Sequence, residues 1–289
     1  YKYITAATNL GFHDGLIAPI TAAFSVSMSK MDGVVAEVQQ SLANVTYMAR
    51  LVSQKLSKTI TAKDKAGKSF NPIDGSKTYY PGISNGGTFG LVVAATSPAP
   101  TRASIIVGGG GLTHFLQRAV QWNQFAPFMK ILYPIAFDQQ LLMALMQTSV
   151  DPIDSMNYAP HLVQKRFAGL KPIGLAMHMA VNDSQVRNMV TEWVTRSAGV
   201  PMITPSPKKI YGLATITAAA PAGAPTGTKA AMFVYDEKVT ASPATNVPPK
   251  TDNGTHGTVR KLTAYQKHVS TFLETGAFVQ VCTGACDPE

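Results

Sequence analysis

The chain has few cysteines, few charged residues and no long apolar run. Two cysteines among 289 residues exclude a disulfide-rich scaffold and a zinc site built from four thiolates. Charged residues make up 14% of the sequence, against roughly 25% in an average globular chain. No stretch approaches the roughly 18 uninterrupted apolar residues that a membrane-spanning helix needs, so we expect no membrane span. Hydrophobic residues nevertheless reach 45%, which predicts a substantial core and a single large globular unit.

Acidic residues are also scarce, and the chain is strongly basic. It contains 16 acidic and 25 basic residues, which gives a net charge of +9. Much of the excess lies in six lysines before the most informative motif: Lys55, Lys58, Lys63, Lys65, Lys68 and Lys77. Such a surface attracts anionic substrates, membranes or nucleic acid. Because aromatic residues do not alternate with these lysines, we interpret the segment as a solvated loop and expect no nucleic-acid partner.

The two cysteines, Cys282 and Cys286, lie close together near the end of the sequence. Gly284 between them allows the tight turn that a short disulfide loop requires, so we expect a disulfide, with two free thiols as the alternative. Two possible ligands without a second pair do not make a zinc site, and we expect neither a metal nor a cofactor. A disulfide is typical of an exported protein, so we expect a secreted or periplasmic location.

The most informative feature is the motif Gly-x-Ser-x-Gly formed by Gly82, Ser84 and Gly86. A β-prone stretch at 79–81 precedes it, and residues 88–95 have the composition of a helix. A serine is a useful nucleophile only when it is exposed, held stiffly and next to a base. A sharp strand-to-helix turn meets the first two conditions, and its flanking glycines let the chain pass close to itself. A plain glycine-rich turn is the alternative interpretation of so short a motif.

Two later segments supply an acid and a base. Residues 172–181 form a continuous apolar run, as expected of a strand buried on both faces, and Asp183 follows directly. A second strand is predicted at 229–235, and His256 lies on the polar loop that comes after it. Side chains just past the carboxyl ends of parallel strands lie at the edge where open α/β sheets build their sites. A helix is predicted at 187–197, closing before Gly199.

Other histidines and acids are possible alternatives to this base and this acid. His178 falls inside a buried strand and His268 in the middle of a helix, so we interpret both as structural. His114 follows a glycine run and is predicted to line the substrate pocket. The other possible acids are those near the end of the helical region and one on the histidine loop: Asp151, Asp154 and Asp252. Asp252 is too close to His256 in sequence for its carboxylate to reach back readily to the imidazole.

The order Ser84, Asp183, His256, each on a loop after a strand, resembles that of the α/β-hydrolase superfamily of serine esterases and lipases. The resemblance covers nearly the whole chain and is most specific at the Gly-x-Ser-x-Gly motif. It implies that Ser84 is the nucleophile, that His256 is the general base and then acid, and that Asp183 orients the imidazole. It also implies that the backbone N–H of Asn85 donates to the oxyanion.

The resemblance implies an α/β-hydrolase fold, a mostly parallel sheet flanked by helices with an inserted helical lid. Residues 1–111 and 167–289 would form the two parts of the core, and 112–166 the lid. This insertion is rich in aromatic residues and methionine, and we expect Trp122 and Phe125 to line the substrate pocket from its apolar face. Ordinary helical core packing is the alternative for these residues.

The remaining segments complete the expected organisation. We expect a strand at 103–107, and the four glycines at 108–111 leave room for the substrate or for the serine turn. A phosphate-binding loop is excluded because no Lys-Ser or Lys-Thr follows. Residues 201–228 and 241–257 are predicted to be loops, and a last helix is expected over 261–274.

The beginning of the chain fits the resemblance less well. Residues 1–8 are predicted to form a strand, residues 9–19 a loop, and residues 20–56 a helix with apolar side chains at helical spacing. The superfamily has further strands upstream, one of which leads to the second oxyanion donor. We therefore expect an N-terminal companion segment, on a cleaved chain or lost from this one, that pairs with residues 1–8.

These features predict a hydrolase of carboxylic esters that works through an acyl-enzyme. Esterases, lipases and hydrolases of polyesters or oligoesters fall within this expectation, and the substrate is a small or polymeric ester. An amidase or peptidase on the same fold is the first alternative. A catalytically silent binding protein that keeps the fold is the second.

Overall fold

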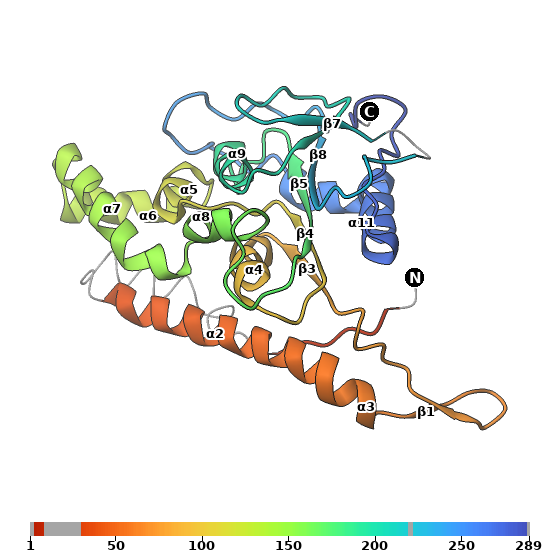
Figure 1. Ribbon diagram of the computed structural model, residues 1–289. Helices are drawn as coiled ribbons and strands as arrows, with labels where there is room; N and C mark the ends of the chain where they lie inside the picture. The colour runs from red at the N-terminus through yellow and green to blue at the C-terminus, as the bar shows by residue number, and fades with distance from the viewer. Residues whose placement is uncertain (1–2, 9–29, 219–221, 288–289) are drawn as a thin grey trace.

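A six-stranded parallel sheet forms the centre of the computed structural model, which describes residues 3–8, 30–218 and 222–287 (Figure 1). Every strand pair in this sheet is parallel. From one edge to the other the strands are β3 (Tyr79–Ile83), β4 (Arg102–Ile106), β5 (Gly174–Ala180), β8 (Ala230–Tyr235), β6 (Met202–Thr204) and β7 (Thr215–Thr217). The predicted α/β class with a mostly parallel sheet is confirmed.

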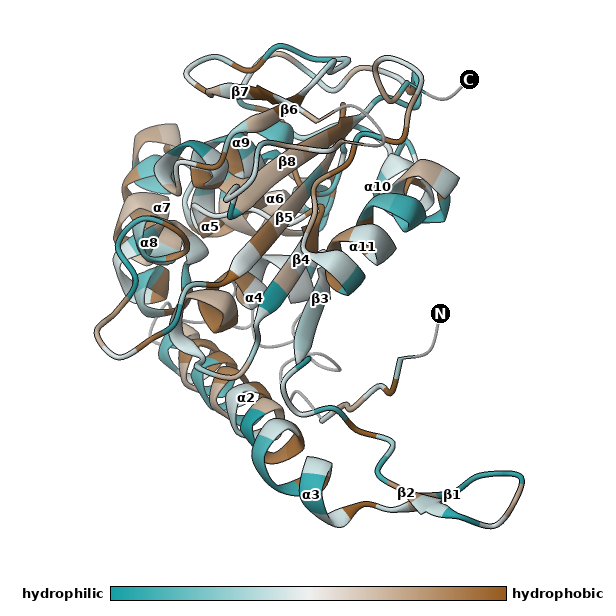
Figure 2. Cartoon of the chain, turned by 45° about the vertical axis from the view of Figure 1, so that its right-hand side comes forward, coloured by the Kyte–Doolittle hydropathy of each residue, from teal (hydrophilic) through white to brown (hydrophobic). Residues whose placement is uncertain are grey.

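The central strands are apolar along almost their whole length because helices cover both of their faces. Side chains that alternate along β5 point to opposite faces, and both Ala176 and Met177 are completely buried. Figure 2 shows β5 and β8 as largely hydrophobic ribbons in the middle of the molecule. Strands buried on both faces are typical of parallel sheets and produce continuous apolar runs in the sequence.

Helices cover the two faces unequally. On one face, α4 (Asn85–Thr96), α8 (Ser155–Tyr158) and α9 (Asn188–Ser197) pack against the sheet through side chains such as Leu91 and Val194. On the opposite face, α11 (Thr263–Thr275) packs through Phe272 and Leu273, close to the short α10 (Thr255–Thr258). In Figure 1, α4 and α9 lie on one side of the strands and α11 on the other.

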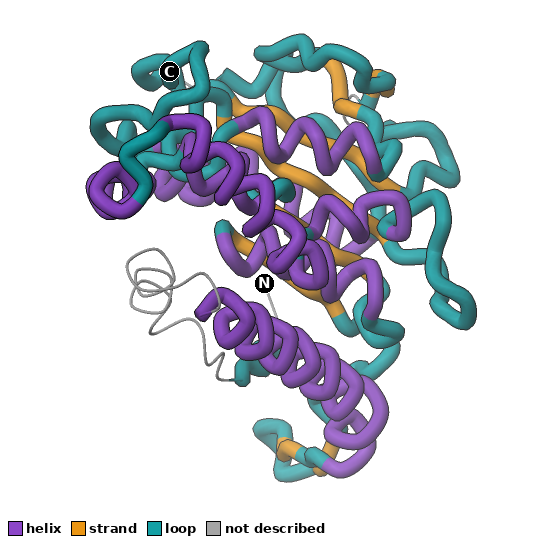
Figure 3. Tube along the Cα trace, turned by 90° about the vertical axis from the view of Figure 1, so that its left-hand side faces the viewer, coloured by secondary structure: helices purple, strands orange, loops and turns teal. Residues whose placement is uncertain are grey.

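A second, helical layer lies beyond the first face. It contains α2 (Met31–Leu51), α5 (Leu112–Arg118), α6 (Trp122–Leu132) and α7 (Ala136–Val150). These helices share an apolar cluster whose buried members include Val38, Phe125, Met129, Met143 and Met146. Figure 3 shows α2 beside the other helices, with the strands beyond them. The helical character predicted for 112–166 is therefore confirmed.

The long helix predicted for residues 20–56 is present where the structure describes it. After α2 the chain continues through a π-helical turn at Val52–Leu56 and the short α3 (Ser57–Thr59). Met31, Val34 and Val38 form its buried face, at the helical spacing read from the sequence. Residues 20–29 of the prediction, and the loop predicted for 9–19, lie outside the described residues.

Two sequence predictions are wrong. Residues 3–8 form no strand, and Tyr3 and Ile4 are exposed, so β-forming composition without a paired neighbour is insufficient. The expected pairing of this segment with a companion chain stays a prediction, and β3 is the edge strand next to β4 among the described residues. The loop predicted at 201–228 contains β6 and β7, whose three residues each are too few to show a period.

A small antiparallel hairpin, β1 (Ala62–Lys63) and β2 (Ser69–Phe70), projects from the body after α3 (Figures 1 and 2). The lysines of this hairpin are exposed, as expected of a solvated segment. Across residues 3–8, 30–218 and 222–287, no helix combines the length and the hydropathy that crossing a bilayer requires.

Candidate active site

Ser84 occupies a strained turn between β3 and α4. Its backbone has φ 57° and ψ −120°, a conformation that side-chain-bearing residues rarely adopt. Gly82 is needed because an added Cβ there would lie 2.4 Å from the carbonyl oxygen of Gly86. The Tyr80 hydroxyl donates a 2.8 Å hydrogen bond to that same oxygen, and the Ser84 N–H donates to the carbonyl of Ile106. The turn therefore holds the serine rigidly at the end of the strand.

Asp183, His256 and Ser84 form one continuous chain of hydrogen bonds. Nδ1 of His256 lies 2.8 Å from Oδ2 of Asp183, and Nε2 lies 2.8 Å from Oγ of Ser84. Asp183 is buried just past β5, where its other oxygen accepts the backbone N–H groups of Gln185 and Val186. An ionised carboxylate accepts only, so Nδ1 carries the proton and Nε2 accepts the serine hydroxyl. The structure thus brings together the three residues chosen from the sequence.

Asn85 is the first residue of α4, directly after Ser84. Its backbone N–H makes no hydrogen bond within the described part of the chain. The first N–H groups of a helix have no partner inside the helix, and the helix dipole makes this end attractive to anions. A negative oxygen that forms next to Ser84 would therefore find a donor already in place.

A second carboxylate, Asp252, joins the acid loop to the histidine loop. The Ser184 hydroxyl and the Gln185 side-chain amide each donate to it at 2.6 Å, and the Gly254 N–H donates at 3.0 Å. Burial raises the pKa of Asp252, but these hydrogen bonds and nearby His256 lower it overall. From its place in the sequence, Asp252 is a candidate only for a partner of the imidazole. The sequence shows only that an acidic residue lies close to His256, which does not predict that Asp252 bridges the two loops.

The other acids weighed from the sequence have different partners. Asp154 is buried and accepts the backbone N–H groups of Gly111 and Leu112 at 2.8 and 2.7 Å, which fixes the start of α5. Asp151 accepts from the side-chain amide of Gln147. Through its hydrogen bond from Gly111, Asp154 also holds the end of the four-glycine segment in place.

The glycine segment 108–111 packs tightly against the serine turn and α9. An added Cβ at Gly108 would lie 2.7 Å from the carbonyl carbon of Gly87, and one at Gly109 would lie 2.6 Å from the Val190 side chain. A larger residue at Gly108 would push against the helix that begins after Ser84, and one at Gly109 would push against α9. The segment therefore leaves room for the serine turn.

The three predicted pocket residues lie on α5 and α6. His114 is exposed, and its ring packs edge to face on Trp193 with 5.5 Å between centroids. Burial, followed by the charge of Arg118, lowers the pKa of His114. Trp122 and Phe125 lie 6.3 Å apart, and Phe125 is buried in the apolar cluster that α6 shares with α2 and α7.

A second serine–histidine pair lies inside the sheet. Oγ of Ser104 is 3.2 Å from Nε2 of His178, whose Nδ1 is 3.0 Å from the hydroxyl of Tyr235. That hydroxyl is also 2.7 Å from His268, which contacts Gln280. Burial, then the charge of His268, holds the pKa of His178 well below its usual range. Among the described residues this pair has no carboxylate partner, and both side chains are buried.

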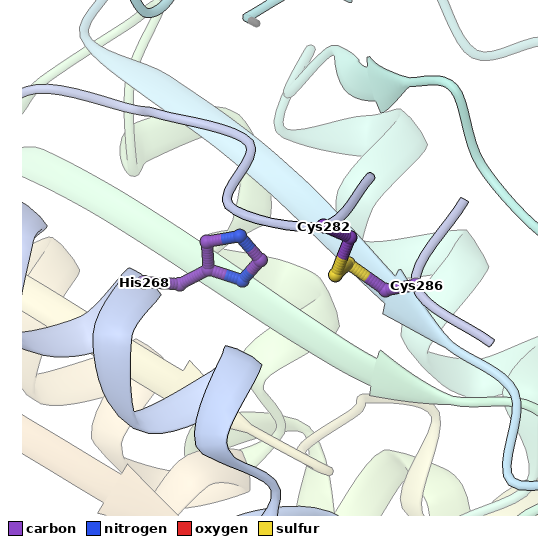
Figure 4. Close-up of side chains that lie close together, drawn as sticks. All are labelled: His268, Cys282 and Cys286. Atoms are coloured by element: carbon purple, nitrogen blue, oxygen red, sulfur yellow. A yellow bond between two sulfur atoms is a disulfide. The ribbon is translucent and has the colours of Figure 1, made fainter. Parts of the chain in front are cut away.

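The predicted disulfide between Cys282 and Cys286 is confirmed. Figure 4 shows the imidazole of His268 facing the bonded sulfur atoms, and the possible ligand atoms of these three residues lie within 4.8 Å of one another. Because each sulfur is bonded to the other, neither is the free thiolate that a zinc ion requires.

The comparisons with known proteins add no relative to this description. No protein-family model matches the chain, and no curated protein sequence matches it significantly. The assignment of a function therefore rests on the geometry of the site.

Proposed function

We propose that this protein is a serine hydrolase that cleaves carboxylic esters through an acyl-enzyme intermediate. The observation that carries the proposal is the hydrogen-bonded chain from Asp183 through His256 to Ser84, with both contacts at 2.8 Å. The serine at its end has a strained backbone and lies next to an unpaired helix N–H group. A nucleophile, a base, a group that orients the base and a donor for an oxyanion are then in one place.

In the proposed reaction, Oγ of Ser84 attacks the ester carbonyl carbon while Nε2 of His256 takes the hydroxyl proton. The carboxylate of Asp183 stabilises the imidazolium that forms, and the Asn85 N–H donates to the oxygen that becomes negative. His256 then gives its proton to the departing alcohol, which leaves an acyl group on Ser84. A water molecule attacks this acyl group with His256 as base, and the tetrahedral species collapses to release the acid and the free serine.

The proposal includes the α/β-hydrolase fold and a lid. It is supported by the positions of Ser84, Asp183 and His256, which follow β3, β5 and β8 respectively, at the carboxyl ends of parallel strands. The helical layer of α5 to α7 follows β4 and would form the lid. Ile131 and Phe137 on this layer are 76% and 73% exposed, which is unusual for large apolar side chains on an ordinary core layer.

The proposed substrate is a small ester or an ester-linked oligomer or polymer. An exported location is supported by the Cys282–Cys286 disulfide, since such bonds persist in oxidising compartments. No cofactor enters the proposed reaction.

The test combines covalent labelling with turnover. A fluorophosphonate probe should label the wild-type protein, and p-nitrophenyl esters of increasing acyl length should be hydrolysed, with neither result in Ser84→Ala. Faster turnover of matched p-nitroanilides than of esters would favour an amidase or peptidase. A folded wild-type protein that neither reacts with the probe nor hydrolyses any ester would show that the fold serves binding alone.

A further inference from the structure

Two arginines beside the acid loop have no acidic partner. Arg118 lies in the last turn of α5, and Arg187 immediately precedes α9, four residues after Asp183. Within the described part of the chain, no Asp or Glu oxygen lies within 4.0 Å of either guanidinium group. Arginine side chains that are only partly exposed usually have a carboxylate partner or contact a ligand.

The two guanidinium groups reach the same short segment of the histidine loop. Nε of Arg118 donates to the side-chain oxygen of Asn246 at 3.1 Å, and Nη2 of Arg187 donates to the carbonyl of Pro243 at 2.6 Å. Nη1 of Arg187 is buried without a hydrogen-bond partner among the described residues. Nη1 of Arg118 also donates to the carbonyl of His114 at 3.1 Å. Because a guanidinium has five N–H groups, Nη2 of Arg118 and Nε of Arg187 remain as donors that these neutral partners do not use.

The charge of Arg118 acts on Arg187. Burial lowers the pKa of Arg187 first, the charge of Arg118 lowers it further, and Asp183 raises it. The carboxylate that acts on Arg187 is already engaged, because Asp183 accepts from His256 and from two backbone N–H groups. Two positive charges that reach one loop segment in a partly buried region repel each other, and an anion bound beside them would remove that cost.

We infer that Arg118 and Arg187 form a binding site for a carboxylate group of the substrate. The inference rests on the proposed function and narrows its substrate class to esters that carry a negative carboxylate away from the scissile bond. Guanidinium groups suit this ligand because their N–H groups match the two oxygens of a carboxylate. The carboxylate belongs either to the acyl part or to the alcohol part of the ester, and the test has one arm for each.

Matched ester pairs provide the measurement. For the acyl side, the mono-p-nitrophenyl ester of adipic acid is compared with the same ester whose free carboxyl is a carboxamide. For the alcohol side, the hexanoyl ester of 4-hydroxybenzoate is compared with that of 4-hydroxybenzamide. In at least one of the two pairs, the wild-type enzyme should hydrolyse the ester with the free carboxylate with a kcat/KM about tenfold higher than its neutral counterpart. This difference should come mainly from a lower KM. Added salt should reduce this ratio.

The double variant Arg118→Gln, Arg187→Gln should bring the ratio to about one. The matched control is Arg196→Gln, which removes an arginine at the other end of α9 that binds the carbonyl of Tyr211. This control should keep the wild-type ratio. Labelling by the fluorophosphonate probe checks that each variant retains a folded site, and each single substitution should give an intermediate ratio if the double variant does not fold.

The inference is overturned if the wild-type enzyme treats both members of both pairs alike, or if the folded double variant keeps the preference. In that case, hydrolysis of the neutral esters by the wild-type protein, and its loss in Ser84→Ala, would still support the proposed hydrolase. If no ester is hydrolysed, calorimetry with adipate decides separately. Binding by the wild-type protein that is lost in Arg118→Gln supports the anion site, and no binding overturns it.

Discussion

Ser84 with His256 and Ser104 with His178 are two serine–histidine pairs in one molecule, with contacts of 2.8 and 3.2 Å. Ser84 lies past the end of β3, whereas Ser104 lies within β4 and is 1% exposed. The far nitrogen of His256 faces a carboxylate, and that of His178 faces the hydroxyl of Tyr235. The residue types and the serine–histidine distances are similar in the two pairs. The pairs differ in whether a negative charge lies next to the histidine and in whether solvent reaches the serine.

The charge difference has a direct chemical consequence. A histidine that accepts the serine proton becomes positive, and Asp183 stabilises that charge next to His256. His178 is buried and has His268 nearby, so both burial and a like charge oppose its protonation. His178 therefore remains neutral and holds the strands together through hydrogen bonds. A serine–histidine contact indicates a nucleophile only when an anion and an open side accompany it.

The largest expected effect separates the two serines. Ser84→Ala should lower kcat/KM for esters by about 10⁴ or more, because it removes the nucleophile of the proposed triad. Ser104→Ala should leave kcat close to the wild-type value and lower only the free energy of unfolding. Ester turnover and urea unfolding of both variants check this. If folded Ser84→Ala protein hydrolyses esters at the wild-type rate, Ser84 is not the nucleophile and the proposed triad is wrong.

A second prediction concerns the buried His268 and pH. Burial lowers the pKa of His268 to about 4, and the hydrogen bond of its imidazole to the side-chain oxygen of Gln280 opposes this only in part. In the unfolded chain the same group titrates near 6.5, so between pH 6.5 and 4 the unfolded state binds a proton that the folded state does not. The free energy of unfolding should therefore fall as the pH falls through this window, by on the order of 3 kcal/mol from this group.

Urea unfolding at pH 7.5 and pH 4.5 measures this loss. His268→Gln should show a smaller loss between the two pH values than the wild-type protein. The partly exposed His161, which contacts the carbonyl of Lys165, provides the matched control His161→Gln with the wild-type loss. An unchanged pH dependence in His268→Gln would show that other groups carry it.

A third prediction tests the hydroxyl that connects the buried histidines. Tyr235→Phe leaves His178 and His268 each without one hydrogen-bond partner inside the core. The expected cost is about 1 to 3 kcal/mol in the free energy of unfolding. kcat for esters should stay near the wild-type value because Tyr235 is not part of the proposed reaction. A lower kcat with an unchanged free energy of unfolding would contradict this prediction and show that Tyr235 affects the reaction at Ser84.

The smallest expected effect concerns Asp252, which bridges the loops that carry Asp183 and His256. Asp252→Asn keeps the shape of the side chain but removes the charge that accepts from Ser184 and Gln185. The two loops should then hold His256 less firmly, and kcat should fall about tenfold with KM nearly unchanged. Asp74→Asn, at an exposed turn where Asp74 accepts from Ser76, is the matched control. Equal kinetics in both variants would assign Asp252 to stability alone.

Features that depend on local sequence were predicted well. The central strands β4, β5 and β8, the helix α9 and the turn at Ser84 agree with their predicted positions. Each has a continuous apolar run, a clear period or glycines at fixed spacing, and these patterns reflect burial and backbone geometry over a few residues. Residues 3–8 also have β-forming composition, but strand formation needs a partner that their sequence does not specify.

The sequence by itself determined the strained serine turn, the buried strands and the order of serine, acid and histidine. Only the tertiary structure showed that His256, predicted from its position after a strand, reaches Ser84, because the two residues lie 172 positions apart in the chain. It also decided that Asp252 bridges two loops and that Arg118 and Arg187 reach one segment. Such contacts depend on how the loops pack at the sheet edge, where exposed polar side chains leave no period in the sequence.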